Sequence, residues 1–133
     1  MSGGLRWIIM GDLAISFTEL GPSEDAVWDA FARDLSERGV NRLLATSLGA
    51  IDVTSAQRRI IADALKQRKI AAAAVMDDRL SRGVVTAVTW QGVDIEIYAW
   101  SELREAILSL NVPPAEVDAV IDATIRLRAA ATT

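Results

Sequence analysis

The chain contains neither cysteine nor histidine. Without cysteine it has no disulfide, no thiol nucleophile and no thiolate ligand for a metal. Without histidine it lacks the imidazole that commonly serves as a general base or zinc ligand, and a Ser–His–Asp triad is excluded. Besides the carboxylates, only two lysines and one tyrosine remain as candidate catalytic groups. We therefore expect a binding protein rather than an enzyme, with no metal or other cofactor.

Long apolar runs and an excess of basic charge are also missing. No run approaches the roughly 20 apolar residues that a membrane-spanning helix needs. The formal charge is −4, from 18 acidic and 14 basic residues, so the chain offers no basic surface for nucleic acid. The stretch MSGGLRW lacks the charged and apolar regions of a secretory signal. These features predict a cytoplasmic protein with no membrane span and no nucleic-acid partner.

Half of the 133 residues are hydrophobic, which is enough for one core, and the length suits a single domain over residues 1–133. Apolar alternation predicts strands over residues 5–10, 13–18 and 93–100, and apolar runs predict buried strands over residues 41–46 and 70–76. Helical spacing predicts helices with caps or first residues at Ser23, Thr54, Asp78, Ser101 and Pro113. The last of these forms an additional C-terminal helix with a frayed tail, over residues 113–133.

The resulting order, β-β-α-β-α-β-α-β-α-α, predicts an α/β fold. Gly11 suits the first central position of a type II′ turn, so the first two strands are expected to form an antiparallel hairpin. The later strands alternate with helices, which implies right-handed crossovers and parallel pairing. We therefore expect a mixed sheet of about five strands packed against helices.

The expected start of the helix after strand 41–46 is rich in hydroxyl groups. Residues Thr54 to Gln57 read T-x-x-Q, which is the pattern of a capping box. This cap alone explains Thr54, at a stabilisation of roughly 1 kcal/mol. Ser55 adds a second hydroxyl, and Asp52 precedes both in the turn.

Two cations follow at the positive end of the same helix. Arg58 and Arg59 are disfavoured there by roughly 0.3–1 kcal/mol, unless an anion is present. They suit a phosphate on Thr54 or Ser55, which the helix N-terminus would also stabilise. The alternative is that Arg59 pairs with Asp63 and Arg58 is solvated. The sequence leaves both interpretations open.

A second hydroxyl lies near the helix that follows strand 70–76. Asp78 is the expected cap, and Ser81 and Arg82 lie in the next turn, where a small anion could bind. Gly83 costs about 1 kcal/mol relative to alanine inside a helix, which suggests a close approach there. The pair Asp77–Asp78 resembles a magnesium site, but the other acids and the lysine of a receiver domain are not in register.

The four tryptophans are the largest contact groups of the chain. Their patterns place Trp7 and Trp28 in the core. Trp90 ends a helix, and Trp100 shares the expected solvent face of strand 93–100 with Tyr98. Exposed aromatic residues are favoured anchors at interfaces, so these three are candidate contacts, although a covering helix would hide them equally well.

The strand NRLLAT, the turn SLGAID and the helix start VTSAQRRII resemble the STAS domain, the fold of anti-sigma factor antagonists and of sulfate-transporter cytoplasmic tails. That family carries an aspartate-serine-serine-glycine turn before a helix whose N-terminus bears a phosphorylatable hydroxyl. Asp52 aligns with the aspartate and Thr54 with the second serine, whereas Val53 and Ala56 replace the first serine and the glycine. The similarity spans about residues 5–110, mostly in the order and spacing of elements.

The resemblance implies a non-enzymatic regulatory domain that binds a kinase/anti-sigma factor or another signalling protein. Phosphorylation of Thr54 or Ser55 would switch that contact, with Arg58, Arg59 and Asp52 around the phosphate. Two alternatives stay open: a constitutive dimeric scaffold without a phosphoswitch, and a sensor of a small ligand such as a nucleotide or lipid.

Overall fold

The computed structural model of the chain describes residues 4–132. Its strands are β1 (Leu5–Met10), β2 (Leu13–Thr18), β3 (Gly21–Pro22), β4 (Arg42–Ser47), β5 (Ile51–Asp52), β6 (Ala71–Val75) and β7 (Ile95–Tyr98). Its α-helices are α1 (Asp25–Glu37), α2 (Ser55–Arg68), α3 (Arg79–Thr89), α4 (Leu103–Ser109) and α5 (Val117–Thr132). Short 3-10 turns, Trp100–Glu102 and Pro114–Glu116, precede α4 and α5.

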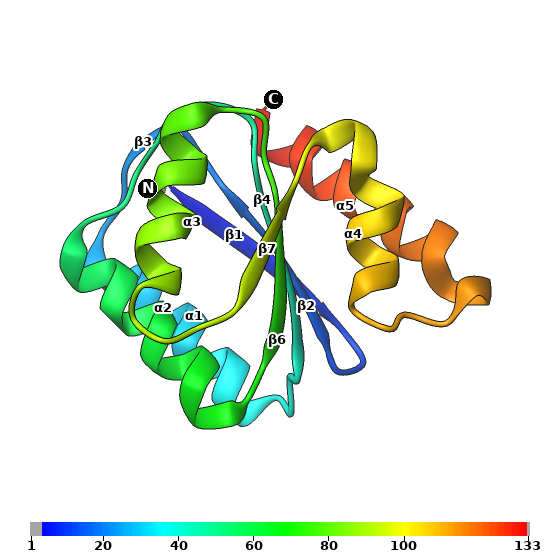
Figure 1. Cartoon of the computed structure of the whole chain (residues 1–133), viewed down its shortest axis with the longest axis horizontal. Helices are drawn as coiled ribbons and strands as arrows, with labels where there is room; N and C mark the ends of the chain where they lie inside the picture. The colour runs from blue at the N-terminus through cyan, green and yellow to red at the C-terminus, as the bar shows by residue number, and fades with distance from the viewer. Residues whose placement is uncertain (1–3, 133) are drawn as a thin grey trace.

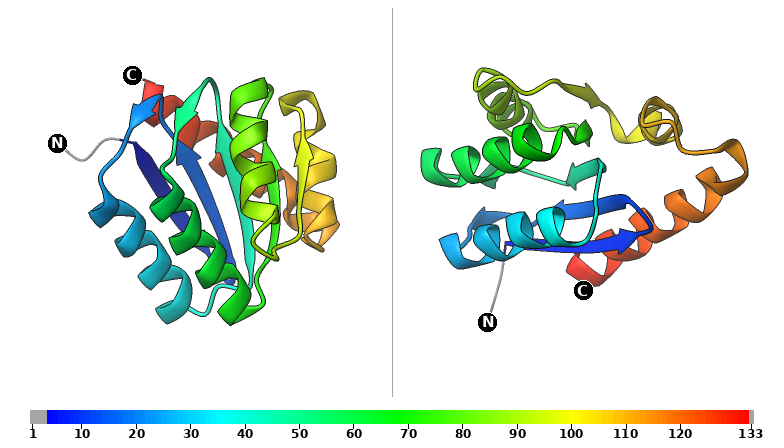
Figure 2. Two further views of the ribbon diagram at one scale, coloured as in Figure 1. Left: turned by 60° about the vertical axis from the view of Figure 1, so that its left-hand side comes forward. Right: turned by 90° about the horizontal axis from the view of Figure 1, so that it is seen from below.

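The five longer strands form one sheet in the order β1-β2-β4-β6-β7. β1 pairs antiparallel with β2, and every other neighbouring pair in this sheet is parallel. Helices α1, α2 and α3 cover one face, and α4 and α5 cover the other (Figures 1 and 2). The expected α/β fold with a mixed five-stranded sheet is confirmed.

Residues alternate along the central strands between two hydrophobic cores. In β2, Ala14 packs under α1 and α2, whereas Ile15 packs under α4 and α5. Every residue of β2 is buried, as expected for a strand covered on both faces. The first core is built around Trp28 and Phe31, and the second around Leu44, Ile107 and other aliphatic residues.

The β1–β2 hairpin turns as expected, and Arg42 links it to the C-terminus of α4. Gly11 has a φ of 62°, while Asp12 does not have a positive φ, which fits a type II′ turn. Arg42 at the start of β4 forms an ion pair with Asp12 and donates from Nη1 to the Leu110 carbonyl at 3.2 Å. The hydrogen bond from Arg42 lowers the pKa of Asp12 below its usual value.

Several expected details of the secondary structure are wrong. Ser101, expected as a helix cap, lies inside the 3-10 turn Trp100–Glu102, and α4 has no side-chain cap. Ser23 does not cap α1, which begins at Asp25 after Glu24; its Oγ instead accepts a hydrogen bond from Trp28 Nε1 at 2.7 Å. The strand expected over residues 93–100 is confined to Ile95–Tyr98, because the chain turns into a 3-10 helix at Trp100. The tail expected to fray is helical through Thr132.

A small parallel bridge between β3 and β5 was not anticipated. Gly21 pairs with Ile51 and Pro22 with Asp52. This bridge lies beyond the carboxyl ends of β2 and β4, and it joins the segments that lead into α1 and α2. It thereby sets the two helix N-termini side by side.

Candidate functional site

The N-terminus of α2 is closed by the expected capping box. Thr54 Oγ1 accepts from the backbone N–H of Gln57 at 3.1 Å, and Gln57 Oε1 accepts from the backbone N–H of Thr54, also at 3.1 Å. Thr54 and Ser55 are both exposed. We refer to Asp52, Thr54, Ser55, Arg58 and Arg59 as the α2 site.

Arg58 folds back over the first turn of α2 instead of extending into solvent. Its Nη1 donates to the Val53 carbonyl at 2.7 Å, and its Nη2 donates to Ser55 Oγ at 3.0 Å. The sequence-based alternative of a solvated Arg58 is therefore not what the structure contains. An exposed serine hydroxyl lies directly against a guanidinium at the positive end of a helix.

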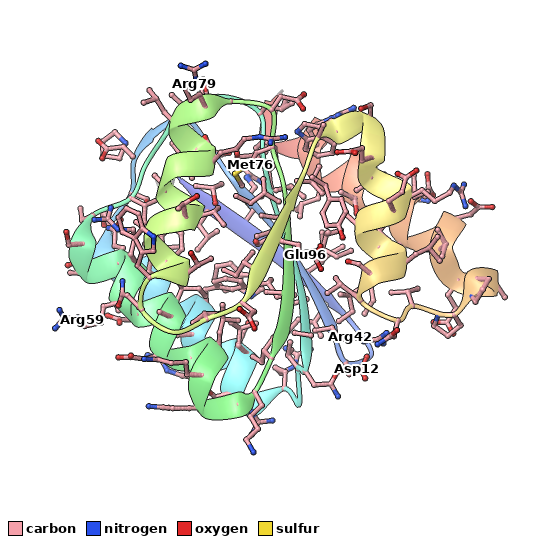
Figure 3. All side chains as sticks on the ribbon, viewed as in Figure 1. Asp12, Arg42, Arg59, Met76, Arg79 and Glu96 are labelled. Carbon is pink, nitrogen blue, oxygen red and sulfur yellow. The ribbon has the colours of Figure 1, made fainter. Side chains whose placement is uncertain are left out.

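The remaining two members of the α2 site are less closely engaged. No salt bridge joins Arg59 to Asp63 in the described part of the chain, so the alternative pairing is not observed. Arg59 points away from the body of the molecule (Figure 3), although it borders the same shallow surface depression as Ser55. Asp52, the last residue of β5, is also exposed.

Gln57 has a second role that the sequence pattern did not indicate. Its side chain is only 1% exposed, and it lies between the N-termini of α1 and α2. Nε2 donates to the Ser23 carbonyl at 2.7 Å and to Asp25 Oδ1 at 2.9 Å. These partners lie more than 30 positions earlier in the chain, so no local motif could have revealed the contact.

At the N-terminus of α3, the polar side chains are hydrogen-bonded within the protein. Asp78 caps the helix as expected, since Oδ2 accepts from the Ser81 backbone N–H at 2.8 Å. Ser81 is 0% exposed, and its Oγ donates to the Gly49 carbonyl at 2.7 Å. Arg82 Nε donates to the Met76 carbonyl at 2.9 Å. Buried and bonded in this way, the Ser81 hydroxyl is not accessible to a kinase or an added anion.

Gly83 does not provide the close approach that was expected from its place in α3. The residue is exposed, and a Cβ added there would meet nothing within 4 Å. The structure therefore gives no packing reason for this glycine.

The candidate aromatic contacts separate into covered and exposed residues. Tyr98 and Trp100 are half-buried against the core under α4 and α5, whereas Glu96, on the same expected solvent face of the strand, is exposed. That face is therefore covered only at its carboxyl end. Trp100 Nε1 donates to the Ser47 carbonyl at 2.7 Å, and the Arg128 guanidinium lies 4.7 Å from the ring centroid. Trp90, at the C-terminus of α3, is 81% exposed. It lies at the end of the sheet opposite to the α2 site.

Exposed aliphatic side chains are concentrated at the carboxyl end of the parallel strands. Three of the five large apolar residues that are exposed in the described chain lie at the carboxyl end of the parallel strands: Leu20, Leu48 and Leu80. Leu20 and Leu48 border one shallow depression, and Leu80 directly precedes Ser81, which bonds to Gly49. We call these three residues the leucine patch.

The cavities of the described chain differ in size and in lining. An apolar cavity of about 70 Å³ lies between the sheet and helices α1–α3. A wider open cleft at the other end of the sheet, bordered by Lys66, Lys69 and Asp94, is about 440 Å³. Within residues 4–132, no three acidic side chains cluster as a metal ion would require.

A scan of family models, a search of curated proteins and a search of solved structures find no match to the chain. No helix in the described part has the length and apolar character needed to cross a membrane.

Proposed function

We propose that this chain is a non-enzymatic regulatory domain that binds another protein, and that phosphorylation at the N-terminus of α2 changes that contact. The observation that carries the proposal is the hydrogen bond from Arg58 to the exposed Ser55 hydroxyl, at 3.0 Å. A phosphate on Ser55 would meet a guanidinium already in place and the positive end of the helix dipole.

The arrangement of elements supports the protein-binding part of the proposal. The parallel strands follow one another in sequence order, and the hydroxyl groups begin the helix after β4. This is the order that the STAS resemblance implies, in which the partner is a kinase/anti-sigma factor or another signalling protein. The leucine patch lies at the same end of the sheet and provides the exposed apolar surface that a protein contact uses.

The two hydroxyls of the site are not equivalent. Thr54 Oγ1 already accepts the capping hydrogen bond from Gln57. Ser55 Oγ lies outside the capping box, and its contact is with Arg58. We therefore rank Ser55 ahead of Thr54 as the phosphorylated residue.

The added charge explains how the contact would switch. A phosphate contributes about −1.5 to −2 charges at neutral pH, and it would add to the charge of Asp52, which is exposed and precedes Ser55 by three positions. Arg58 compensates part of this charge locally, while the rest alters the potential of the face that also carries the leucine patch. A partner that contacts this face then binds with a different affinity.

A capture experiment tests the proposal. The unmodified protein and protein carrying phosphoserine at position 55 are used to retain partners from the native cells, and phosphoserine at the exposed Ser101 serves as the control. We expect one partner whose retention changes at least tenfold with phosphate on Ser55 and is unchanged with phosphate on Ser101. Leu48→Lys is expected to abolish retention, whereas Leu108→Lys, on the exposed face of α4, is not.

Equal retention by all forms would contradict the phosphoswitch and leave a constitutive scaffold. Failure to retain any protein, together with a rise in melting temperature on adding a nucleotide or a lipid, would favour the ligand sensor.

A further inference from the structure

The side chain of Gln57 connects two helices whose first residues, Asp25 and Ser55, lie 30 positions apart in the sequence. Toward its own helix, Oε1 accepts from the Thr54 backbone N–H at 3.1 Å. Toward α1, Nε2 donates to the Ser23 carbonyl at 2.7 Å and to Asp25 Oδ1 at 2.9 Å. Both donor hydrogens and the acceptor oxygen of the amide are thus engaged in a side chain that is 1% exposed.

Only one orientation of this amide is compatible with its neighbours. In the opposite orientation Oε1 would face two acceptor oxygens, those of Ser23 and Asp25, and Nε2 would face the N–H donor of Thr54. A buried polar group that is fully satisfied in one arrangement fixes the relative position of the elements it joins. Gln57 therefore holds the start of α1 at a defined position on the start of α2.

The connection continues to a tryptophan. Ser23 accepts from Gln57 through its carbonyl and from Trp28 Nε1 through its hydroxyl, the latter at 2.7 Å. Trp28 lies in the core between the sheet and α1. A continuous chain of hydrogen bonds thus leads from Thr54, through Gln57 and Ser23, to the indole of Trp28.

We propose that Gln57 is a positioning residue that transmits changes at Thr54 to the N-terminus of α1. The surface that responds to modification then includes the start of α1, where Glu24 and Asp25 are exposed, as well as the start of α2. This inference deepens the proposed function, and its regulatory use rests on that function. The coupling itself is a property of the fold and is measurable without a partner or a kinase.

The indole N–H signals of the four tryptophans provide the readout. In nitrogen-15 spectra of the full chain, each signal is assigned from a Trp→Phe variant. Thr54→Val removes the Oγ1 acceptor of the capping box while nearly preserving the shape of the side chain. We expect this substitution to shift the Trp28 indole signal and the backbone amides of residues 23–25. The indole signals of Trp90 and Trp100 should not move.

Gln57→Leu is the matched test of the transmission. In this background, Thr54→Val should leave the Trp28 indole and the amides of residues 23–25 unchanged, because the connecting amide is gone. The inference is overturned if Thr54→Val does not move the Trp28 signal in the parent chain, or if it moves it equally in the Gln57→Leu background.

A second variant, Gln57→Glu, tests the coupling if Gln57→Leu does not fold. It retains an acceptor oxygen for Thr54 but replaces the NH₂ donor by an oxygen that faces Ser23 and Asp25. Loss of hydrogen bonds of ordinary strength predicts about tenfold faster amide exchange at Val27, in the first turn of α1. The amide of Gln57 should keep its protection. Unchanged exchange at Val27 contradicts the inference, whatever the outcome of the phosphorylation and capture experiments.

Discussion

The N-termini of α2 and α3 look alike in sequence and differ in what they can do. Each follows a parallel strand, each has a side-chain cap, and each places a serine and an arginine in the first turns. At α2 the serine is exposed and its hydroxyl contacts Arg58. At α3 the serine is buried, and the hydroxyl and Arg82 are both bonded to backbone carbonyls.

The difference arises from what covers each helix start. The loop that carries Gly49 lies over the first turn of α3 and accepts the Ser81 hydroxyl. The first turn of α2 has α1 on one side only, where Gln57 is buried, and its outer side faces solvent. The same pair of residues at a helix start therefore has two outcomes. At α3 the serine hydroxyl is buried in a structural hydrogen bond, whereas at α2 it is exposed and accessible to modification.

The largest expected effect comes from placing a charge at each serine. Ser81→Asp should lower the free energy of unfolding by about 3 kcal/mol or more, because the carboxylate would be buried beside Asp78 and the Gly49 carbonyl. Ser55→Asp should change it by less than about 0.5 kcal/mol, since an exposed acid suits a helix N-terminus. Urea denaturation of both variants measures the contrast, and equal losses would show that the two sites do not differ in burial.

Removing Gln57 should give the next largest effect. Gln57→Ala deletes three hydrogen bonds made by a buried side chain, so a loss of about 2 kcal/mol is expected. Gln67→Ala, an exposed position of the same helix, is the control and should change the stability by less than about 0.5 kcal/mol. If both variants lose the same stability, the bridge between α1 and α2 contributes nothing to folding.

Removing the N-cap side chain of α2 or of α3 should lower the stability by similar amounts. Thr54→Ala and Asp78→Ala each remove an N-cap acceptor, which typically costs about 1 kcal/mol. We expect the greater loss for Asp78→Ala, because the carboxylate also lies 3.2 Å from Ser81 Oγ and carries a charge that the helix N-terminus favours. Thermal unfolding measures the order, and a greater loss for Thr54→Ala would reverse it.

The smallest effect is expected at the far end of the sheet, where Asp12 and Arg42 pair. Because Arg42 lowers the pKa of Asp12, the pair stabilises the fold above the unfolded-state pKa of the carboxyl. That contribution is lost as the pH falls through the lower, folded-state pKa. In Asp12→Asn, stability should therefore decline less steeply below about pH 4 than in the parent chain. Identical pH profiles, measured by urea denaturation, would exclude this contribution.

The sequence predicted the features that depend on near neighbours. The order of the elements, the turn at Gly11 and the capping box from Thr54 to Gln57 involve residues within a few positions of each other. Apolar periodicity and turn chemistry act over that range, so the pattern was sufficient for them. The fold class followed from the same local signals.

The features that the sequence missed depend on distant contacts. Ser81 bonds to Gly49, Gln57 to Ser23, and Trp100 to Ser47, across separations of 32, 34 and 53 positions. The alternation over residues 93–100 predicts that Trp100 faces solvent. In the structure, Trp100 packs instead against the core under α4 and α5. Local periodicity carries no information about which later helix packs on a given face.

The most direct test is phosphopeptide mapping of the protein isolated from its native cells during growth, starvation and stress. The account predicts phosphate on Ser55, with Thr54 as the only other acceptor at this site, and none on Ser81. Absence of phosphate from both Thr54 and Ser55 under every condition, or phosphate on Ser81, would contradict it.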